Sequence, residues 1–135
     1  MYCRGIRGAT TVAQNDANAI IAATRELLEA IITANGIRPE DIASAVFSVT
    51  PDLNATFPAQ AARDLGWTHV ALFCCQEVAV PDSLPSCIRV LIHWNTPKLQ
   101  HEISHVYLGE AKKLRPDLST DFSKTDPLQP MERST

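Results

Sequence analysis

The nine residues "CIRVLIHWN" at positions 87–95 predict a strand that holds one residue a core strand does not need. Apolar side chains recur there at every second position, which is the period of a strand lying on an apolar core. They are Ile88, Val90, Ile92 and Trp94. The other face carries Arg89, between Cys87 and Leu91. An arginine at that position must bind an anion, reach water or stay a costly unpaired charge, so its presence needs an explanation.

The remaining sequence predicts more strands and two helices around this one. The helices are expected at residues 15–35 and 58–65, and the strands at residues 2–12, 42–50, 68–75, 87–95 and around 104–108. In the longer helix, apolar residues at three- and four-residue spacing lie between the capping residues Asn15 and Asp16 and the stop at Gly36. This order predicts an α+β fold, with a mixed sheet and the helices on one face. The chain has little left to cover the other face, so we expect self-association.

Length and composition predict one domain. A chain of 135 residues is long enough to bury a core and too short for a second one. We expect the domain to span residues 1–118 and the polar segment 119–135, which holds two prolines, to be a mobile tail.

Charge and cysteine usage limit the partners and the compartment. The net charge of -3 argues against a nucleic acid or an anionic membrane as partner, because both need a concentrated basic face. No stretch approaches the roughly 20 apolar residues of a membrane span, and arginines occupy the N-terminus where a signal peptide needs an apolar core. Of the four cysteines, Cys74 and Cys75 are adjacent and make a poor disulfide pair. We therefore expect reduced thiols and a cytoplasmic location.

Residues 101–105, "HEISH", match the short pattern of zinc proteases. That chemistry needs a stable helix with both histidines on one face, and a third ligand. The segment instead follows Pro97 and leads into a strand, and Leu108 and Ala111 stand where the extended pattern needs glycine and histidine. We therefore expect no metal site, and two histidines in a solvated loop.

Several charged residues stand beside unusual sequence. The arginines are Arg7 between two glycines, Arg63 on the short helix, Arg89 in the strand and Arg115 before a proline. For any one arginine, a surface ion pair is the simpler account. Glu77 is a further candidate for a functional residue, because it ends an apolar strand, where a glutamate is uncommon unless it is paired or bonds another group.

Five separated motifs, in order and at near-family spacing, show a resemblance to a known family. They are "RGIRGATTV" at 4–12, "TPDLNATFPAQAARDLGW" at 50–67, "CCQEVAV" at 74–80, "CIRV" at 87–90, and "HVYL" at 105–108 followed by "LRPDL" at 114–118. The chain resembles the monofunctional, trimeric chorismate mutases of bacteria, which are distinct from the all-helical type. The resemblance implies an α+β protomer, three of which form a trimeric pseudo α/β-barrel with active sites between subunits.

The same resemblance implies a reaction and its substrate. Chorismate, a dianion, would rearrange to prephenate in a pericyclic step that leads to phenylalanine and tyrosine. No cofactor, metal or covalent intermediate is expected. The enzyme would hold the compact reactive conformer and stabilise the charge that appears as bonds change.

Roles for the central residues follow from the resemblance. Arg89 matches the arginine that donates to the ether oxygen, where negative charge develops as the C–O bond breaks. Glu77 matches the glutamate that hydrogen-bonds the ring hydroxyl, with Cys74 beside the same group. Arg7 matches the residue that grips a carboxylate, with Tyr107 beside it.

The resemblance also implies a pocket wall and a mouth. Phe57 and Ala59 match a wall contributed by a neighbouring subunit, and Leu114 matches another part of the wall. Arg63 and Arg115 match basic residues near the mouth.

Two other substrate-contacting positions depart from the family pattern. Gln60 stands where lysine is common, so one electrostatic contact at the mouth differs. Phe73 replaces a small polar residue and alters the pocket wall.

Two other functions fit parts of this pattern. A reactive-enamine deaminase resembles the same trimeric fold and also binds carboxylates with a strand arginine. A non-catalytic sensor of an aromatic-pathway acid would use the same arginines, but would not need Glu77 beside the ring. The "RGIRGATT" and "CCQE" motifs favour the mutase over the deaminase.

Overall fold

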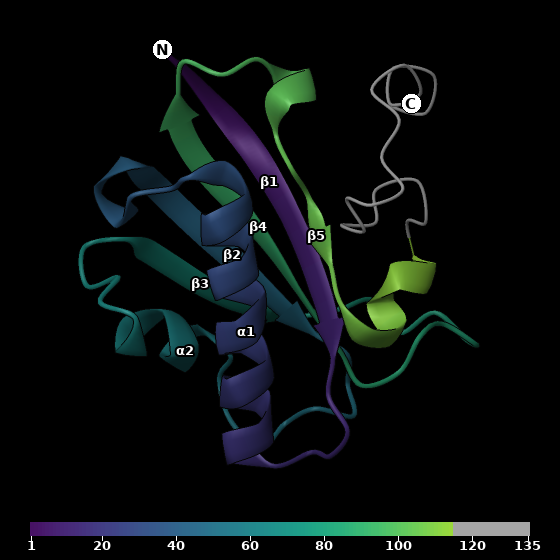
Figure 1. The fold of residues 1–135 in the computed structure, drawn as a ribbon. Helices are drawn as coiled ribbons and strands as arrows, with labels where there is room; N and C mark the ends of the chain where they lie inside the picture. Colours follow the sequence, from purple (N-terminus) through teal and green to yellow (C-terminus); the bar gives the residue numbers. More distant parts are fainter. Residues whose placement is uncertain (115–135) are drawn as a thin grey trace.

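A five-stranded mixed sheet with two helices on one face makes up residues 1–114, the part of the chain that the computed structural model describes (Figure 1). Its elements are β1 (Tyr2–Thr11), α1 (Ala17–Asn35), β2 (Ile42–Val49), α2 (Ala59–Asp64), β3 (Ala71–Gln76), β4 (Cys87–Thr96) and β5 (Val106–Tyr107). Three short 3-10 turns accompany them: η1 (Pro39–Asp41) and η2 (Gln100–Glu102) lie between elements, and η3 (Gly109–Lys113) follows β5. Arg115 and the expected tail at 119–135 lie outside the described residues.

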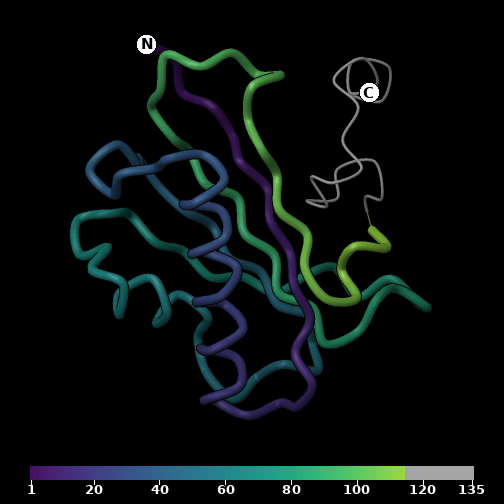
Figure 2. The backbone as a smooth tube through the Cα atoms, in the orientation of Figure 1, coloured from purple at the N-terminus to yellow at the C-terminus, as the bar shows by residue number. Residues whose placement is uncertain are grey.

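Strand β4, which carries Arg89, lies at the centre of the sheet. The order is β3-β2-β4-β1-β5, and β4 is antiparallel to both of its neighbours. At the two edges, β3 runs parallel to β2, and β5 runs parallel to β1. The path of the chain through this arrangement can be followed in Figure 2. The predicted α+β class, with a mixed sheet and the helices on one face, is confirmed.

Helix α1 begins and ends at the predicted signals. The Asp16 side chain accepts a hydrogen bond from the Ala19 N–H, and Gly36 adopts a left-handed conformation with φ of 72°. The face between these caps buries Leu27 and Ile31 completely. A Cβ atom on Gly8 of β1 would lie 2.7 Å from the Ile31 Cδ1 atom, so the glycine lets α1 approach the sheet closely.

The third strand begins later than predicted. Residues 68–75 were expected to be extended, but β3 starts at Ala71. Thr68 and His69 are exposed in the loop that follows α2. They contribute no apolar surface to the core, so pairing with β2 starts only at Ala71, opposite Ser44.

The two faces of the sheet differ in cover. The alternating side chains of β4 from Ile88 to Trp94 lie beneath α1 and α2, as the period predicted. We call the opposite side the open face. The register places on it Arg7, Ala9, Ser48, Phe73, Cys75, Arg89, Leu91 and Tyr107. Among residues 1–114, cover lies at one end of this face, where Ala111 and Leu114 pack in a small cluster with Ala9 and Tyr107.

Candidate active site

Two rows of side chains cross the open face. In the first row Arg89 of β4 lies between Ser48 of β2 and Ala9 of β1. Tyr107 of β5 extends that row beyond Ala9, and Cys75 of β3 extends it beyond Ser48. Because the pairing of all five strands fixes this row, the backbone that carries Arg89 is held rigidly.

The second row runs beside the first. Leu91 of β4 lies between Arg7 of β1 and Val46 of β2, and Phe73 of β3 lies beyond Val46. Arg7 and Arg89 are therefore on adjacent strands and on the same face. Two guanidinium groups so placed suit a ligand with more than one negative charge.

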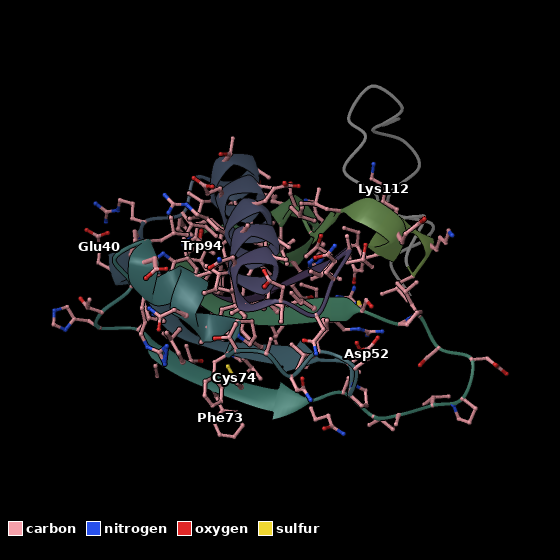
Figure 3. The ribbon with its side chains drawn as sticks, turned by 90° about the horizontal axis from the view of Figure 1, so that it is seen from below. Glu40, Asp52, Phe73, Cys74, Trp94 and Lys112 are labelled. Atoms are coloured by element: carbon pink, nitrogen blue, oxygen red, sulfur yellow. The ribbon has the colours of Figure 1, made fainter. Side chains whose placement is uncertain are left out.

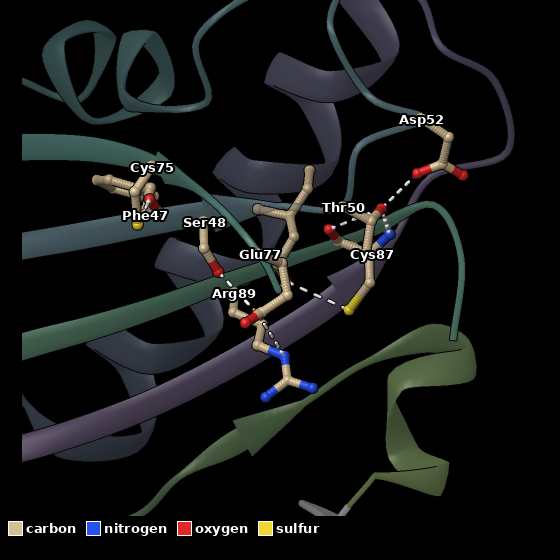
Figure 4. Close-up of polar contacts among 9 residues, drawn as sticks. Phe47, Ser48, Thr50, Asp52, Cys75, Glu77, Cys87 and Arg89 are labelled. Carbon is tan, nitrogen blue, oxygen red and sulfur yellow. Dashed lines mark hydrogen bonds and ion pairs between the residues drawn. The ribbon is translucent and has the colours of Figure 1, made fainter. Parts of the chain in front are cut away.

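Glu77 reaches Arg89 across the intervening strand β2. The Glu77 N–H donates to the Val49 carbonyl at 2.8 Å, which extends the β3–β2 pairing by one residue. Its carboxylate Oε2 atom accepts from the Ser48 hydroxyl at 3.0 Å and lies 3.1 Å from the Arg89 Nε atom. Figure 4 shows the carboxylate between these two groups. Glu77 is therefore paired, and its partner is Arg89, a contact that the sequence did not predict.

The Arg89–Glu77 pair is open to solvent. The Arg89 side chain is 49% exposed and the Glu77 side chain is 29% exposed. Cys87 lies next to them on β4 and is buried. Burial raises the pKa of the Cys87 thiol, and the positive charge of Arg89 opposes that rise. The Cys87 thiol beside the Arg89–Glu77 pair is therefore neutral.

The other side of the candidate site is built on β1 and β5. Arg7 is exposed, and its backbone N–H donates to the His105 Nδ1 atom at 2.9 Å. Tyr107 is buried at one end of the open face, in the cluster that Leu114 also contacts. The structure thus brings Arg7, Tyr107 and Leu114 to the same face as Arg89.

Cys74 does not point to that face. Its register partner is the fully buried Phe47, and the Cys74 side chain packs against the main core beneath the helices. In Figure 3, Cys74 and Phe73 lie on opposite sides of β3. Within one chain, Cys74 is therefore separated by the sheet from the groups that surround Arg89. The neighbouring thiol, Cys75, is the one that faces the open side.

A second group of predicted residues lies on or just before α2, on the covered side of the sheet. Phe57 is 69% exposed, whereas Ala59 is buried in the core of its own chain and offers only backbone to a ligand. The Gln60 side chain donates to Asp64 at 2.9 Å and accepts from Arg63 at 3.4 Å. These residues face away from Arg89 in the same chain. Arg115 lies outside the described residues.

Two contacts within the site were not predicted from the sequence: the bond from Ser48 to Glu77 and the bond from Arg7 to His105. The period of β2 carried a signal for Ser48, because alternate residues of that strand share the face of Arg89. His105 lies in the loop before β5, as predicted, but the residue is half-buried, and the bond that its Nδ1 atom accepts from the Arg7 N–H was not predicted. The expectation of a solvated position holds for His101, which is exposed. Within residues 1–114, no three His, Cys, Asp or Glu side chains are placed to hold a metal ion.

Known proteins share this sequence and this fold. Over residues 3–118 the chain matches the family described as chorismate mutase type I. The chorismate mutase AroH of Thermus thermophilus is 52% identical over 118 residues, which are 87% of this chain and 97% of that protein. The AroH of Bacillus subtilis (strain 168) is 48% identical over 120 residues, 88% of this chain and 94% of that protein. A solved chorismate mutase from Clostridium thermocellum matches with a TM-score of 0.80 at 52% identity, covering 81% of this chain and 97% of the other.

The fold and the site together define an α+β protein with an arginine–glutamate pair on an exposed sheet face. The chain belongs to the type I chorismate mutase family. No helix among residues 1–114 is long and apolar enough to cross a membrane.

Proposed function

We propose that this protein catalyses the rearrangement of chorismate to prephenate, at a site shared between neighbouring copies in a homotrimer. The observation that carries the proposal is the Arg89–Glu77 pair on the open face, with Arg7 on the adjacent strand. This arrangement offers two cations and one carboxylate to a ligand, in a chain whose family carries out this reaction. A dianionic substrate with a hydroxyl group fits these groups.

Arg89 supplies the stabilisation of the transition state. As the C–O bond of chorismate breaks ahead of C–C bond formation, negative charge grows on the ether oxygen. A guanidinium group has five N–H donors, so the contact of Nε with Glu77 leaves donors for that oxygen. Because the central strand β4 holds Arg89, little reorganisation is needed as the charge develops.

The other predicted residues hold the substrate. Glu77 accepts a hydrogen bond from the ring hydroxyl and faces the ring, which becomes partly positive. Arg7 binds a carboxylate, and Tyr107 and Leu114 shape that end of the pocket. Holding both ends keeps the substrate in its compact conformer, which lowers the entropic part of the barrier. No step of this reaction uses a cofactor or a metal.

Two copies are needed to complete the pocket. The exposed Phe57 and Arg63 lie on the covered side of the sheet, so they reach an Arg89 only on another chain. We assign the wall and the mouth to the neighbouring subunit. The positions concerned are Phe57, the backbone of Ala59, Gln60, Arg63 and Cys74, with Arg115 as a further basic residue. Phe73 contributes to the wall from the open face of the chain that carries Arg89. Head-to-tail contacts of this kind close into a ring, here of three subunits that form a pseudo α/β-barrel.

Exposed apolar side chains support the assembly. Phe73 is 65% exposed and Leu91 is 37% exposed on the open face, and Val78 and Val80 after β3 are 75% and 57% exposed. Apolar residues gathered in this way are typical of an interface between subunits. All four cysteines are free thiols, which suits the reducing cytoplasm.

An assay with chorismate tests the function. We expect the absorbance of chorismate to fall in the presence of the protein, with prephenate as the sole product, and sedimentation to give a trimer. Binding of chorismate without turnover would instead indicate a sensor. An active monomer would contradict the shared site.

A further inference from the structure

We propose that Ser48 is a positioning residue for the reaction, and that it acts by fixing the carboxylate of Glu77. The inference rests on the proposed function and assigns a role on β2, a strand that held no predicted site residue. The Ser48 hydroxyl donates to the Oε2 atom of Glu77 at 3.0 Å, between groups that are 29 residues apart in sequence.

The two contacts of the Glu77 carboxylate meet on one atom. Oε2 accepts from Ser48 and lies 3.1 Å from the Arg89 Nε atom. Glu77 has three rotatable side-chain bonds and stands just past the end of β3, where the bond from its N–H to the Val49 carbonyl holds the backbone but not the side chain. Two donors on Oε2 fix these bonds and leave Oε1 to face the ligand.

The sheet register explains why Ser48 is suited to this task. Glu77 follows the edge strand β3, whereas Arg89 lies on β4, and β2 separates the two strands. Ser48 is the register partner of Arg89 on that intervening strand. Its side chain therefore lies in the space that the Glu77 carboxylate must cross. Serine is short enough to leave this space open, and its hydroxyl supplies the donor.

Ser44 provides a matched control. It lies on the same strand and the same face, half-buried like Ser48, and its hydroxyl is 2.9 Å from the His93 Nδ1 atom. Ser44 thus makes one side-chain hydrogen bond across the β2–β4 pair, but none to Glu77 or Arg89. Replacing either serine by alanine removes one hydroxyl from the open face, and only Ser48→Ala releases Glu77.

The test combines these variants with Glu77→Gln. We expect Ser48→Ala to lower kcat about tenfold with little change in KM, because a carboxylate that must be oriented during each turnover loses pre-organisation. Ser48→Thr keeps the hydroxyl and should retain most of the activity. Ser44→Ala should match the wild type. In a Glu77→Gln background, Ser48→Ala should cost less than about twofold, because its target is already altered.

The outcomes separate the possible failures. A wild-type protein without turnover would overturn the proposed function and this inference together. An active wild type with an equally active Ser48→Ala variant would overturn the inference alone. Equal losses from Ser48→Ala with and without Glu77→Gln, accompanied by a lower melting temperature, would also overturn it, because they would mark a purely structural role.

Discussion

Arg89 and Glu77 are close enough to attract each other, but both remain accessible to solvent. Their side chains are 49% and 29% exposed. Ion pairs at this exposure contribute about 0–1 kcal/mol to stability, because water screens the charges. A buried pair would instead cost about 3–5 kcal/mol when one partner is removed. Because the pair is exposed, replacing Arg89 or Glu77 should change the catalytic rate much more than the free energy of unfolding.

For Arg89, activity should fall much more than stability. Removing one preorganised donor to a developing negative charge typically lowers the rate by about 100- to 1000-fold. We expect Arg89→Ala to lose at least that much kcat and to keep a melting temperature near that of the wild type. Arg89→Lys keeps the charge but not the planar fork, so only partial activity should remain. Measuring kcat and thermal unfolding on one preparation checks this, and normal turnover with early melting would refute it.

Replacements of Glu77 should separate hydrogen bonding from charge. Glu77→Gln keeps an acceptor for the substrate hydroxyl and loses the charge, whereas Glu77→Ala loses both. The expected order of kcat is therefore wild type, then Gln, then Ala. Steady-state kinetics of the three proteins give the order, and equal values would remove Glu77 from the site.

Individual residues also show where sequence reasoning ends. The faces of β4 follow from its clean alternation, so the positions of Arg89 and Leu91 were predictable. The run "ALFCC" of β3 is apolar throughout and has no alternation, so the orientation of Cys74 was not. The contact between Arg7 and His105 joins residues 98 positions apart, and no local pattern encodes it.

Among the elements, the packing of α1 on β1 depends on a missing side chain. A Cβ atom on Gly8 would lie 2.7 Å from Ile31 Cδ1 and 3.2 Å from Leu27 Cδ1, whereas one on Gly5 would meet only Leu91 Cδ1 at an ordinary 3.5 Å. We expect Gly8→Val to lower the free energy of unfolding by about 1–3 kcal/mol, as overpacking does. Gly5→Val, on the same strand, should be close to neutral. Urea unfolding of both variants makes the comparison, and equal effects would contradict it.

A polar network joins the end of β2 to the start of β4. The Asp52 carboxylate accepts from the Thr50 hydroxyl and from both the backbone and the hydroxyl of Ser86, and Thr50 in turn accepts from the Cys87 N–H. The bond from Thr50 is the main cause that lowers the pKa of Asp52. A lowered pKa in the folded state means stabilisation above the unfolded pKa, which is lost as the pH falls through the folded value.

The network predicts a pH-dependent loss of stability. Asp52→Ala should lower the melting temperature at pH 7, where the carboxylate is charged. The difference from the wild type should shrink in acid, where both the folded and the unfolded wild type carry a protonated Asp52. Thermal unfolding at several pH values tests this. A difference that stays constant or grows on acidification would show that the charge of Asp52 does not stabilise the fold.

Across whole elements, the predicted bounds were close where the period was long and only approximate at the short edge strands. Helix α1 has more than five turns of consistent spacing between two strong caps, so its bounds were predicted within two residues. Strand β5 has only two residues, Val106 and Tyr107, and is held by its neighbours. Such a strand carries too few positions to show a period, and only its approximate place could be predicted.

For the whole molecule, one face of the sheet decides the expected assembly. The sequence predicted helices for a single face, and the open face of residues 1–114 is covered only at the end where η3 packs. Self-association could therefore be predicted from the sequence by physical argument. The number of subunits could not be predicted in this way, because no local sequence pattern in one protomer shows the rotational symmetry of the assembly. That number comes from the family resemblance.

Hybrid trimers test the shared site most directly. Each active site is expected to consist of two halves from neighbouring subunits. Arg89→Ala damages the half on the open face, and Arg63→Glu damages the half near α2. Each variant alone should therefore be nearly inactive. In trimers refolded from an equal mixture, a site that takes one half from each of two neighbours is intact in about one quarter of cases. We therefore predict about one quarter of wild-type activity. A matched mixture of Arg89→Ala with Glu77→Ala damages the same half in every subunit and should show no recovery. A first mixture that stays as inactive as its parents would contradict the account.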